Sequence, residues 1–338
     1  MHRPTTRRPA RGRSRSGRFS RRPTGKGGLG KPRGPRPSLA VPWIDATQGH
    51  LERFADATIA ATKTVEPDAV RDARLESRTL YEALEGLRPW IHAGRFARTH
   101  RLVRKVRRIL SPVREKDRLI QMIQRLVGES RWAPLEGLLS ELIEQRAQAA
   151  EKAKKKLAGV RTARLRTDLT ATLTDLHASP PQSRSLASHL APSMARRRDR
   201  FIEALALSVQ EGPGHGARLL IDERKLRHTV ELLGTLPSID AREALEALDI
   251  VGRYLEEWWD AGLLETLLAA KVEQLSGSRG KKKELTRLKA LLEEVREGRV
   301  DYMERAWLSV DSTGLRKALR ELVRVAVREA QPPRPHWR

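Results

Sequence analysis

Apolar residues recur at intervals of three and four positions from about Trp43 to near the C-terminus. This interval matches the turn of an α-helix, whereas a half-buried strand alternates apolar and polar residues at every second position. Leu, Ala, Arg and Glu dominate the same stretch, and no alternating run of β-branched residues interrupts it. Three of these four are among the best helix formers, and glutamate follows closely. The sequence therefore predicts an all-α protein.

Prolines suggest where the helices begin and end. Pro67 suits the first turn of a helix, and Arg88-Pro89 suits its end. Ser111-Pro112 resembles an N-cap followed by a first-turn proline, so we expect the preceding arginine-rich helix to end there. The segment 176–193, rich in Pro and Ser, is the best candidate for an internal linker. The last helix is expected over 312–330.

Two segments resemble each other at an offset of 146 residues. "RTLYEALEGL" begins at Arg78 and "RKLRHTVELL" begins at Arg224, and the two share an arginine, two leucines and a glutamate at equivalent positions. An internal repeat of this length indicates two tandem helical bundles. The expected organisation is a disordered basic tail (1–40), a first bundle (41–180), a linker (181–193), a second bundle (194–331) and a disordered C-terminus (332–338).

The chain is strongly basic. Lys and Arg outnumber Asp and Glu by 67 to 42, which gives a net charge of +25, and residues 1–38 hold thirteen of the cations and no acid. Such a charge favours polyanionic partners. The sequence contains no cysteine, which excludes disulfides and thiolate metal sites. It also contains no apolar run long enough to span a membrane and no recognisable signal peptide.

Arginines form rows along two of the expected helices. Arg71, Arg74 and Arg78 occupy positions i, i+3 and i+7 beside the apolar face of their helix, and Arg101, Arg104 and Arg108 repeat this spacing. Residues at these intervals lie on one side of a helix, where each guanidinium can meet a different phosphate. The alternative is a solvated basic face, in which Arg78 forms a weak ion pair with Glu82 at i+4.

The same residues resemble the conserved histidine α-helical domain, or CHAD, family. Its first-half motif is similar to the helix that carries Arg71, Arg74 and Arg78, followed by "LSPVREKD" at 110–117. Its second-half motif is similar to the segment from Ile221 to Glu231. The histidines that give the family its name are replaced here by Arg71 and Ala217, so the chain resembles a divergent member.

The lack of a membrane span and of a signal peptide predicts a cytoplasmic protein. The resemblance implies a non-catalytic protein that binds inorganic polyphosphate in a basic groove between two helical bundles, and it extends to association with polyphosphate granules. It implies no cofactor and no metal, and a homodimer is a further option. The candidate polyphosphate-binding residues are Arg71, Arg74, Arg78, Arg101, Arg104, Arg108, Arg114, Arg218, Arg224, Lys225, Arg227 and His228.

Two other functions are compatible with the sequence. The tail at 1–38 has the Arg, Gly and Ser content of arms that bind RNA or DNA without sequence preference. A helical protein of this kind can also act as an adaptor for another protein, with its charges serving only solubility. No nucleophile elbow, phosphate-binding glycine loop or metal-binding histidine pair points to an enzyme.

Overall fold

A computed structural model describes residues 40–130, 133–211, 216–236, 239–277 and 281–330 of the 338-residue chain. Within these residues the chain forms ten α-helices, one short 3-10 helix and no strand, so the all-α prediction is confirmed. The helices are α1 (Ala40–Lys63), α2 (Pro67–Leu87), α3 (Ala93–Ser130), α4 (Ala133–Ala158), α5 (Thr162–Ala178), α6 (Ser183–Glu211), α7 (Gly216–Leu233), α8 (Arg242–Ser276), α9 (Lys282–Ser312) and α10 (Leu315–Ala330). Apart from Ala40, the expected disordered tail and C-terminus lie outside the described residues.

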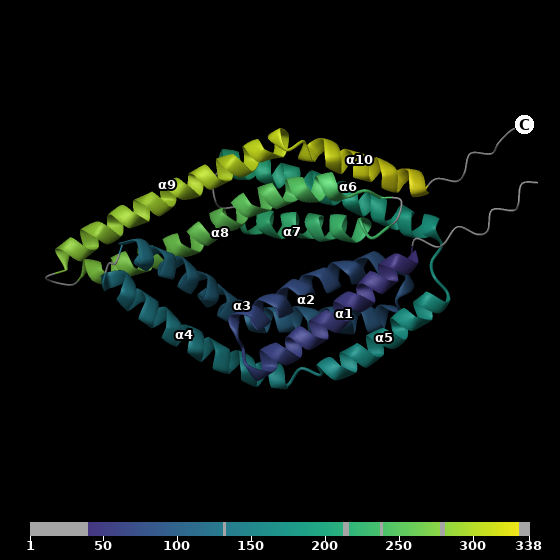
Figure 1. Ribbon diagram of the computed structural model, residues 1–338, viewed down its shortest axis with the longest axis horizontal. Helices are drawn as coiled ribbons and strands as arrows, with labels where there is room; N and C mark the ends of the chain where they lie inside the picture. Colours follow the sequence, from purple (N-terminus) through teal and green to yellow (C-terminus); the bar gives the residue numbers. More distant parts are fainter. Residues whose placement is uncertain (1–39, 131–132, 212–215, 237–238, 278–280, 331–338) are drawn as a thin grey trace, which may run out of the picture. The chain divides into compact units, whose positions relative to one another are not determined.

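The helices form two bundles with the same order of contacts. In the first bundle α1 packs on α2, α2 on α3, α3 on α4, and α5 returns to α1. In the second bundle α6 packs on α7, α7 on α8, α8 on α9, and α10 returns to α6 (Figure 1). Each contact in one bundle therefore has its counterpart five helices later, as the internal repeat predicts.

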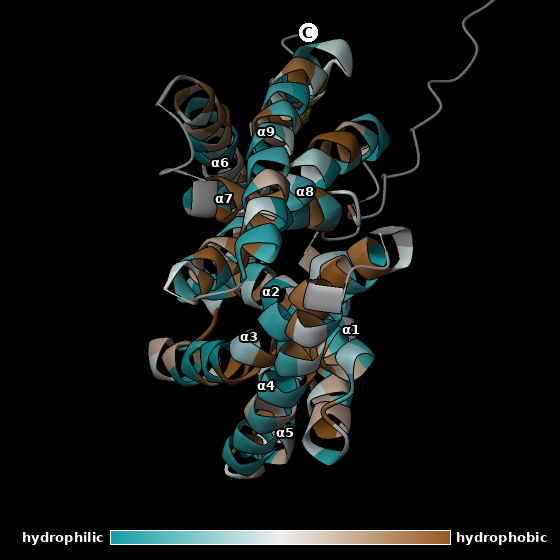
Figure 2. Cartoon of the chain, turned by 90° about the vertical axis from the view of Figure 1, so that its left-hand side faces the viewer, coloured by the Kyte–Doolittle hydropathy of each residue, from teal (hydrophilic) through white to brown (hydrophobic). Residues whose placement is uncertain are grey.

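Two apolar contacts join the bundles. Helices α2 and α7 meet within the main core, where Leu80, Leu226 and Val230 are fully buried. A separate cluster joins the far ends of the α3–α4 and α8–α9 hairpins through residues such as Ile123 and Leu268. Figure 2 shows apolar and polar segments alternating along the helices. The middle parts of α3 and α8 lie between these two contacts.

Helix α2 begins at Pro67 and ends at Leu87, as its flanking prolines predict. The expected helix end at Ser111-Pro112 is wrong, because α3 continues through Pro112. The proline ring is exposed, while Leu110 and Val113 beside it are fully buried. The packing of these two side chains offsets the cost of about 3 kcal/mol for a proline inside a helix.

The expected linker is also largely helical. Helix α6 begins at Ser183 and contains Pro192, so residues 183–193 belong to its first turns rather than to a loop. The fully or nearly buried side chains of Leu186, Leu190 and Met194 explain why the helix continues past this proline, since they extend the apolar face into the core. None of the described helices is both long and apolar enough to cross a bilayer.

Candidate functional site

The arginine row of α2 divides into two environments. Arg71 is exposed and pairs with Asp68 at 3.1 Å and Asp72 at 3.3 Å. Arg74 and Arg78, one and two turns further on, are half-buried. The spacing therefore places all three on one side of the helix, but only the last two face the interior between the bundles.

Helix α3 adds three arginines to the same region. Because the helix is continuous through Pro112, Arg107, Arg114 and Arg118 lie on one side of it. Arg107 also lies 5.9 Å from the centre of the Tyr81 ring on α2, a cation–π contact that helps to hold its guanidinium in place. These cations come from parts of the helix on both sides of the proline.

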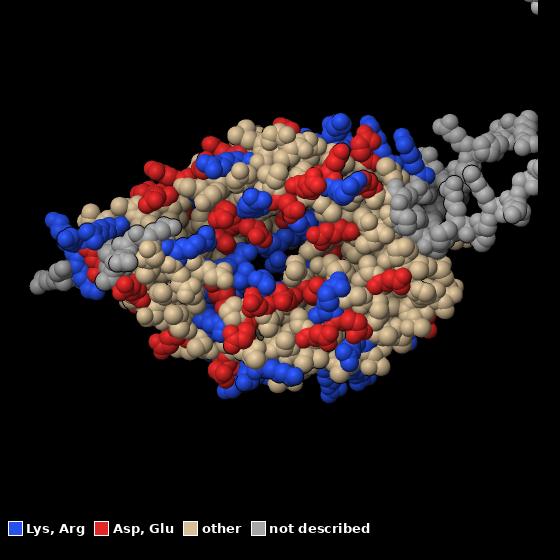
Figure 3. Space-filling model, in the orientation of Figure 1, with Lys and Arg blue, Asp and Glu red and all other residues tan. Residues whose placement is uncertain are grey.

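The second bundle contributes Arg224 from α7. Its charge lowers the pKa of both Arg74 and Arg78, and the charges of Arg107 and Arg118 do the same. We call these residues and Arg114 the central arginine cluster. Figure 3 shows a hollow in the middle of the molecule with Lys and Arg side chains gathered in it and Asp and Glu around its rim. The members of the central arginine cluster are Arg74, Arg78, Arg107, Arg114, Arg118 and Arg224.

The cluster holds positive charge at a high energetic cost. Burial and then repulsion from Arg224 lower the pKa of Arg74 to about 10 and the pKa of Arg78 to about 8. Burial also lowers the pKa of Arg107 and of Arg114. Because guanidinium groups keep their proton at neutral pH, the lowered pKa values indicate that it is unfavourable to gather these charges here.

Two carboxylates of α8 neutralise one side of the cluster. Arg224 donates a hydrogen bond to Glu256 at 2.8 Å, and Arg118 donates one to Asp260 at 2.8 Å. Burial alone would raise the pKa of Glu256, but Arg224 and Arg118 hold it below its usual range. Burial raises the pKa of Asp260. This side of the cluster is therefore charge-compensated.

The other four arginines of the cluster lack such partners. Among the described residues, no carboxylate lies within ion-pairing distance of them. Glu82, the expected i+4 partner of Arg78, instead pairs with Arg197 of α6 at 2.6 Å. The weak local ion pair that would have made Arg78 an ordinary surface residue is therefore not formed. The four arginines are Arg74, Arg78, Arg107 and Arg114.

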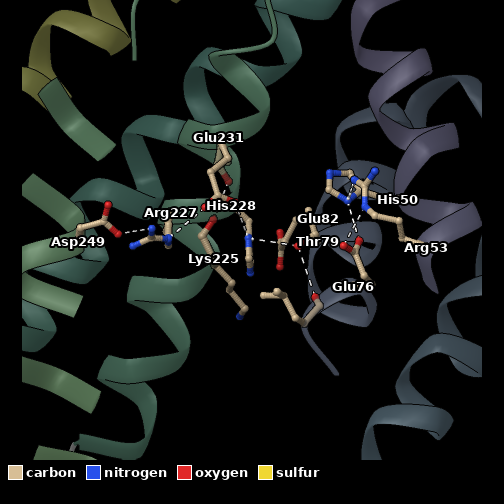
Figure 4. Close-up of polar contacts among 12 residues, drawn as sticks. His50, Arg53, Glu76, Thr79, Glu82, Lys225, Arg227, His228, Glu231 and Asp249 are labelled. Carbon is tan, nitrogen blue, oxygen red and sulfur yellow. Dashed lines mark hydrogen bonds and ion pairs between the residues drawn. The ribbon is translucent and has the colours of Figure 1, made fainter. Parts of the chain in front are cut away.

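The remaining second-half candidates lie outside the cluster and have partners of their own. Arg218 and Lys225 lie 3.7 Å and 4.0 Å from Asp222. Arg227 pairs with Glu231 at 3.0 Å and with Asp249 (Figure 4). These cations therefore serve contacts within the second bundle.

His228 is buried where α7 meets α2. Its Nδ1 lies 2.8 Å from Glu231 and 3.4 Å from the Thr79 hydroxyl, so it connects the two bundles (Figure 4). Figure 4 also shows His50 and Arg53 of α1 meeting Glu76 of α2, an ion-pair network within the first bundle. The geometry gives His228 a role in joining α2 to α7.

The second predicted arginine row, which lies on α3, also divides into two environments. Arg104 is exposed and lies close enough to the cluster to lower the pKa of Arg107. Arg108 is exposed, and Arg101 lines a separate hollow on the outside of the first bundle. Sequence reasoning missed Arg107 and Arg118. Continuing the row at intervals of three and four from Arg104 through Pro112 would have found both.

The comparisons with known proteins agree with this architecture. Residues 45–269 match the family model described as CHAD domain, which is more than half of the chain. The chain belongs to the CHAD family. A solved structure, the CHAD domain from the plant Ricinus communis, matches with a TM-score of 0.60 over 84% of this chain and 92% of that chain, at 16% sequence identity. No curated protein matches this chain.

The first of the two altered histidine positions of the family is Arg71. In this CHAD chain Arg71 is exposed and paired with two aspartates, and its charge adds to the burial that lowers the pKa of Arg114, so it lies at the edge of the cluster. The acid that ends the first-half motif, Asp117, is buried and accepts a hydrogen bond from Arg146 at 2.9 Å. Arg146 also donates to the carbonyl of Val65, in the turn between α1 and α2, at 2.6 Å. Asp117 therefore fixes the position of α3 against α4 and this turn.

Proposed function

We propose that this CHAD protein binds inorganic polyphosphate and that the central arginine cluster is the binding site. The observation that carries the proposal is the pair of Arg74 and Arg78, two largely buried cations whose pKa is lowered by burial and by the charges of other arginines, and which form no ion pair with a described carboxylate. A polyanion entering the hollow would replace this repulsion by attraction. Polyphosphate suits the site because it offers successive charges and no base edges to be read.

The chemistry of the cluster supports binding rather than catalysis. A guanidinium can donate two parallel hydrogen bonds to one phosphate, and it stays protonated, so it neutralises the ligand without exchanging protons with it. Binding releases counterions from the chain, and affinity should therefore fall steeply with salt. The proposal extends to the cytoplasm and to association with polyphosphate granules. A sequence without cysteine agrees with a reducing compartment.

The test is binding of long-chain polyphosphate to the full-length chain at ~150 mM salt, where the Debye length is about 8 Å. Arg74→Gln/Arg78→Gln is expected to bind about a hundredfold more weakly, because each hydrogen bond to a charged group contributes about 1.5–3 kcal/mol. Arg164→Gln/Arg305→Gln removes the same charge from exposed, ion-paired positions away from the cluster and should bind almost like the wild type. Equal losses in the two variants would contradict the proposal.

Nucleic-acid competitors separate this function from the main alternative. Duplex DNA and single-stranded RNA should displace polyphosphate poorly if the cluster is the site. If RNA binds tightly and Arg74→Gln/Arg78→Gln leaves its affinity unchanged, the basic residues at 1–38 account for binding instead. That result would favour a nucleic-acid-associated protein.

A further inference from the structure

A second basic hollow lies on the outside of the first bundle. It has a volume of about 300 Å³ and is formed by the first third of α3 and the turn between α4 and α5. Apolar parts of Leu102 and Val160 contribute to its surface, and four cations surround them. We call it the outer hollow. The residues that line it are Arg98, Arg101, Leu102, Lys105, Gly159, Val160 and Arg161.

The outer hollow has no counterions of its own. Its lining includes no acid, and none of its four cations forms an ion pair with a described carboxylate. Arginines nearby on α5 differ in this respect, since Arg164 pairs with Asp168 and Arg166 lies 3.7 Å from both Glu52 and Asp56. Clustered cations without compensation create a positive potential that attracts anions.

The sequence of α3 explains this imbalance. From Ala93 to Arg114 the helix contains no Asp or Glu, although cations recur on nearly every turn. The α4–α5 turn then brings Arg161 to the same place from a distant part of the sequence. The positive charge of the outer hollow is therefore produced by tertiary packing as well as by one basic helix.

Exposed arginines connect the outer hollow to the central arginine cluster. At about 100° per residue, Arg98 and Lys105 project from one side of α3 and Arg107 from the opposite side. Arg104 and Arg108 lie on the arc between them, and both are exposed. Arg104 is also close enough to Arg107 to lower its pKa. A continuous path of cations thus crosses the solvent face of the helix.

We propose that the outer hollow is a second phosphate-binding site, occupied by the same polyphosphate chain as the central arginine cluster. The chain crosses α3 over Arg104 and Arg108. This inference rests on the proposed function and adds a selectivity for chain length. From Arg98 to Arg118 the helix extends about 30 Å, so a triphosphate reaches one of the two sites and a long chain reaches both.

Occupation of both sites by one chain has a measurable signature. Once a chain is held in the cluster, its contact with the outer hollow is intramolecular and increases the affinity without a second association step. We expect long-chain polyphosphate to lose about tenfold or more in affinity when the outer hollow is neutralised. The slope of log K against log salt should fall in magnitude by about 3, since each lost phosphate contact contributes about 0.7–0.9.

The experiment compares two full-length variants that lose the same charge. Both ligands, tripolyphosphate and long-chain polyphosphate, are titrated by calorimetry against each variant and the wild type. The control positions are exposed cations of α9 without ion pairs among the described residues. The outer-hollow variant is Arg98→Gln/Arg101→Gln/Lys105→Gln/Arg161→Gln, and the control variant is Lys282→Gln/Lys283→Gln/Arg287→Gln/Lys289→Gln.

The expected result is a loss for the outer-hollow variant that is confined to long-chain polyphosphate, with the control variant close to the wild type. Equal losses in both variants would overturn the inference, because net charge alone would then explain them. Equal losses for both ligands would also overturn it, because the two sites would not share one chain. If the proposed function itself fails, Arg74→Gln/Arg78→Gln binds long-chain polyphosphate as tightly as the wild type. This result distinguishes that failure from failure of the outer-hollow inference alone.

Discussion

Replacing Arg78 by methionine is expected to stabilise the protein without ligand and to weaken its binding of polyphosphate. Arg78 is largely buried, and the charged side chains that lower its pKa are other arginines. Methionine retains a flexible, unbranched side chain that can follow the path of the arginine stem, but it carries no charge. The substitution therefore removes repulsion from the free protein and one phosphate contact from the complex.

The fall in the pKa of Arg78 sets the scale of this effect. Each pKa unit corresponds to ~1.36 kcal/mol, so the fall in the pKa of Arg78 from the usual arginine value to about 8 corresponds to about 6 kcal/mol of unfavourable free energy for the charged form. The gain in the free energy of unfolding on substitution will be smaller than this, because neighbouring arginines can move apart and because the apolar stem of Arg78 itself contributes packing. Replacing even a buried ion pair by apolar side chains is often neutral or stabilises by about 1–4 kcal/mol, and Arg78 has no ion-pair partner to lose. We expect about 2 kcal/mol in the free energy of unfolding, or about 4 °C in Tm.

The assay is urea denaturation and thermal unfolding in a phosphate-free buffer, with and without long-chain polyphosphate. Arg71→Met is the matched control, because Arg71 lies on the same helix but is exposed and paired with Asp68 and Asp72. Its substitution should change the free energy of unfolding by less than about 0.5 kcal/mol. A destabilised Arg78→Met, or an undiminished rise in its Tm on adding polyphosphate, would refute the reasoning.

Two further predictions test the structure away from the ligand. Burial raises the pKa of Glu223 to about 7, so the native state keeps a proton that the unfolded chain releases near pH 4.5, and stability falls as pH rises between these values. Glu223→Gln should therefore be more stabilising at pH 8 than at pH 5. The difference in the free energy of unfolding should be at most about 3 kcal/mol. Identical effects at the two pH values in urea denaturation would contradict this. A Cβ at Gly86 would lie 2.4 Å from Cζ2 of the buried Trp43, so Gly86→Ala should destabilise by about 1–3 kcal/mol. At Gly137 in α4 an added Cβ would meet nothing within 4 Å, so Gly137→Ala should stabilise the protein by about 0.5–1 kcal/mol. If the two alanine variants shifted the urea midpoint equally, the close packing at Gly86 would be contradicted.

Much of the fold was predictable because helical periodicity and the internal repeat are properties of the sequence alone. The limits of α2 follow from its flanking prolines. The failures at Pro112 and Pro192 have one physical cause, since each proline lies in a helix whose buried face continues on both sides of it. Proline disfavours a helix locally, but tertiary packing decides whether the helix ends.

The site was less predictable than the fold. The arginine row identified Arg74 and Arg78 because it depends on spacing within one helix, and the repeat together with the family resemblance pointed to Arg224. Spacing does not reveal which cations have found an acid from another helix. The partnership of Glu82 with Arg197 and of Arg224 with Glu256 connects residues far apart in the sequence, and such contacts decide which arginines are ion-paired and which are not.

The two apolar contacts between the bundles explain how the cluster stays assembled without a ligand. The arginines of α2 and α3 repel Arg224, and this repulsion alone would drive the bundles apart. Separation would expose fully buried side chains on both sides of the cluster, such as Leu226 in the main core and Ile123 at the hairpin ends. Burial of each such side chain contributes about 1.5–3 kcal/mol, so several together outweigh the repulsion. Because Glu256 and Asp260 of α8 already neutralise the second-bundle side, a phosphate chain should make its strongest contacts with the uncompensated arginines of α2 and α3.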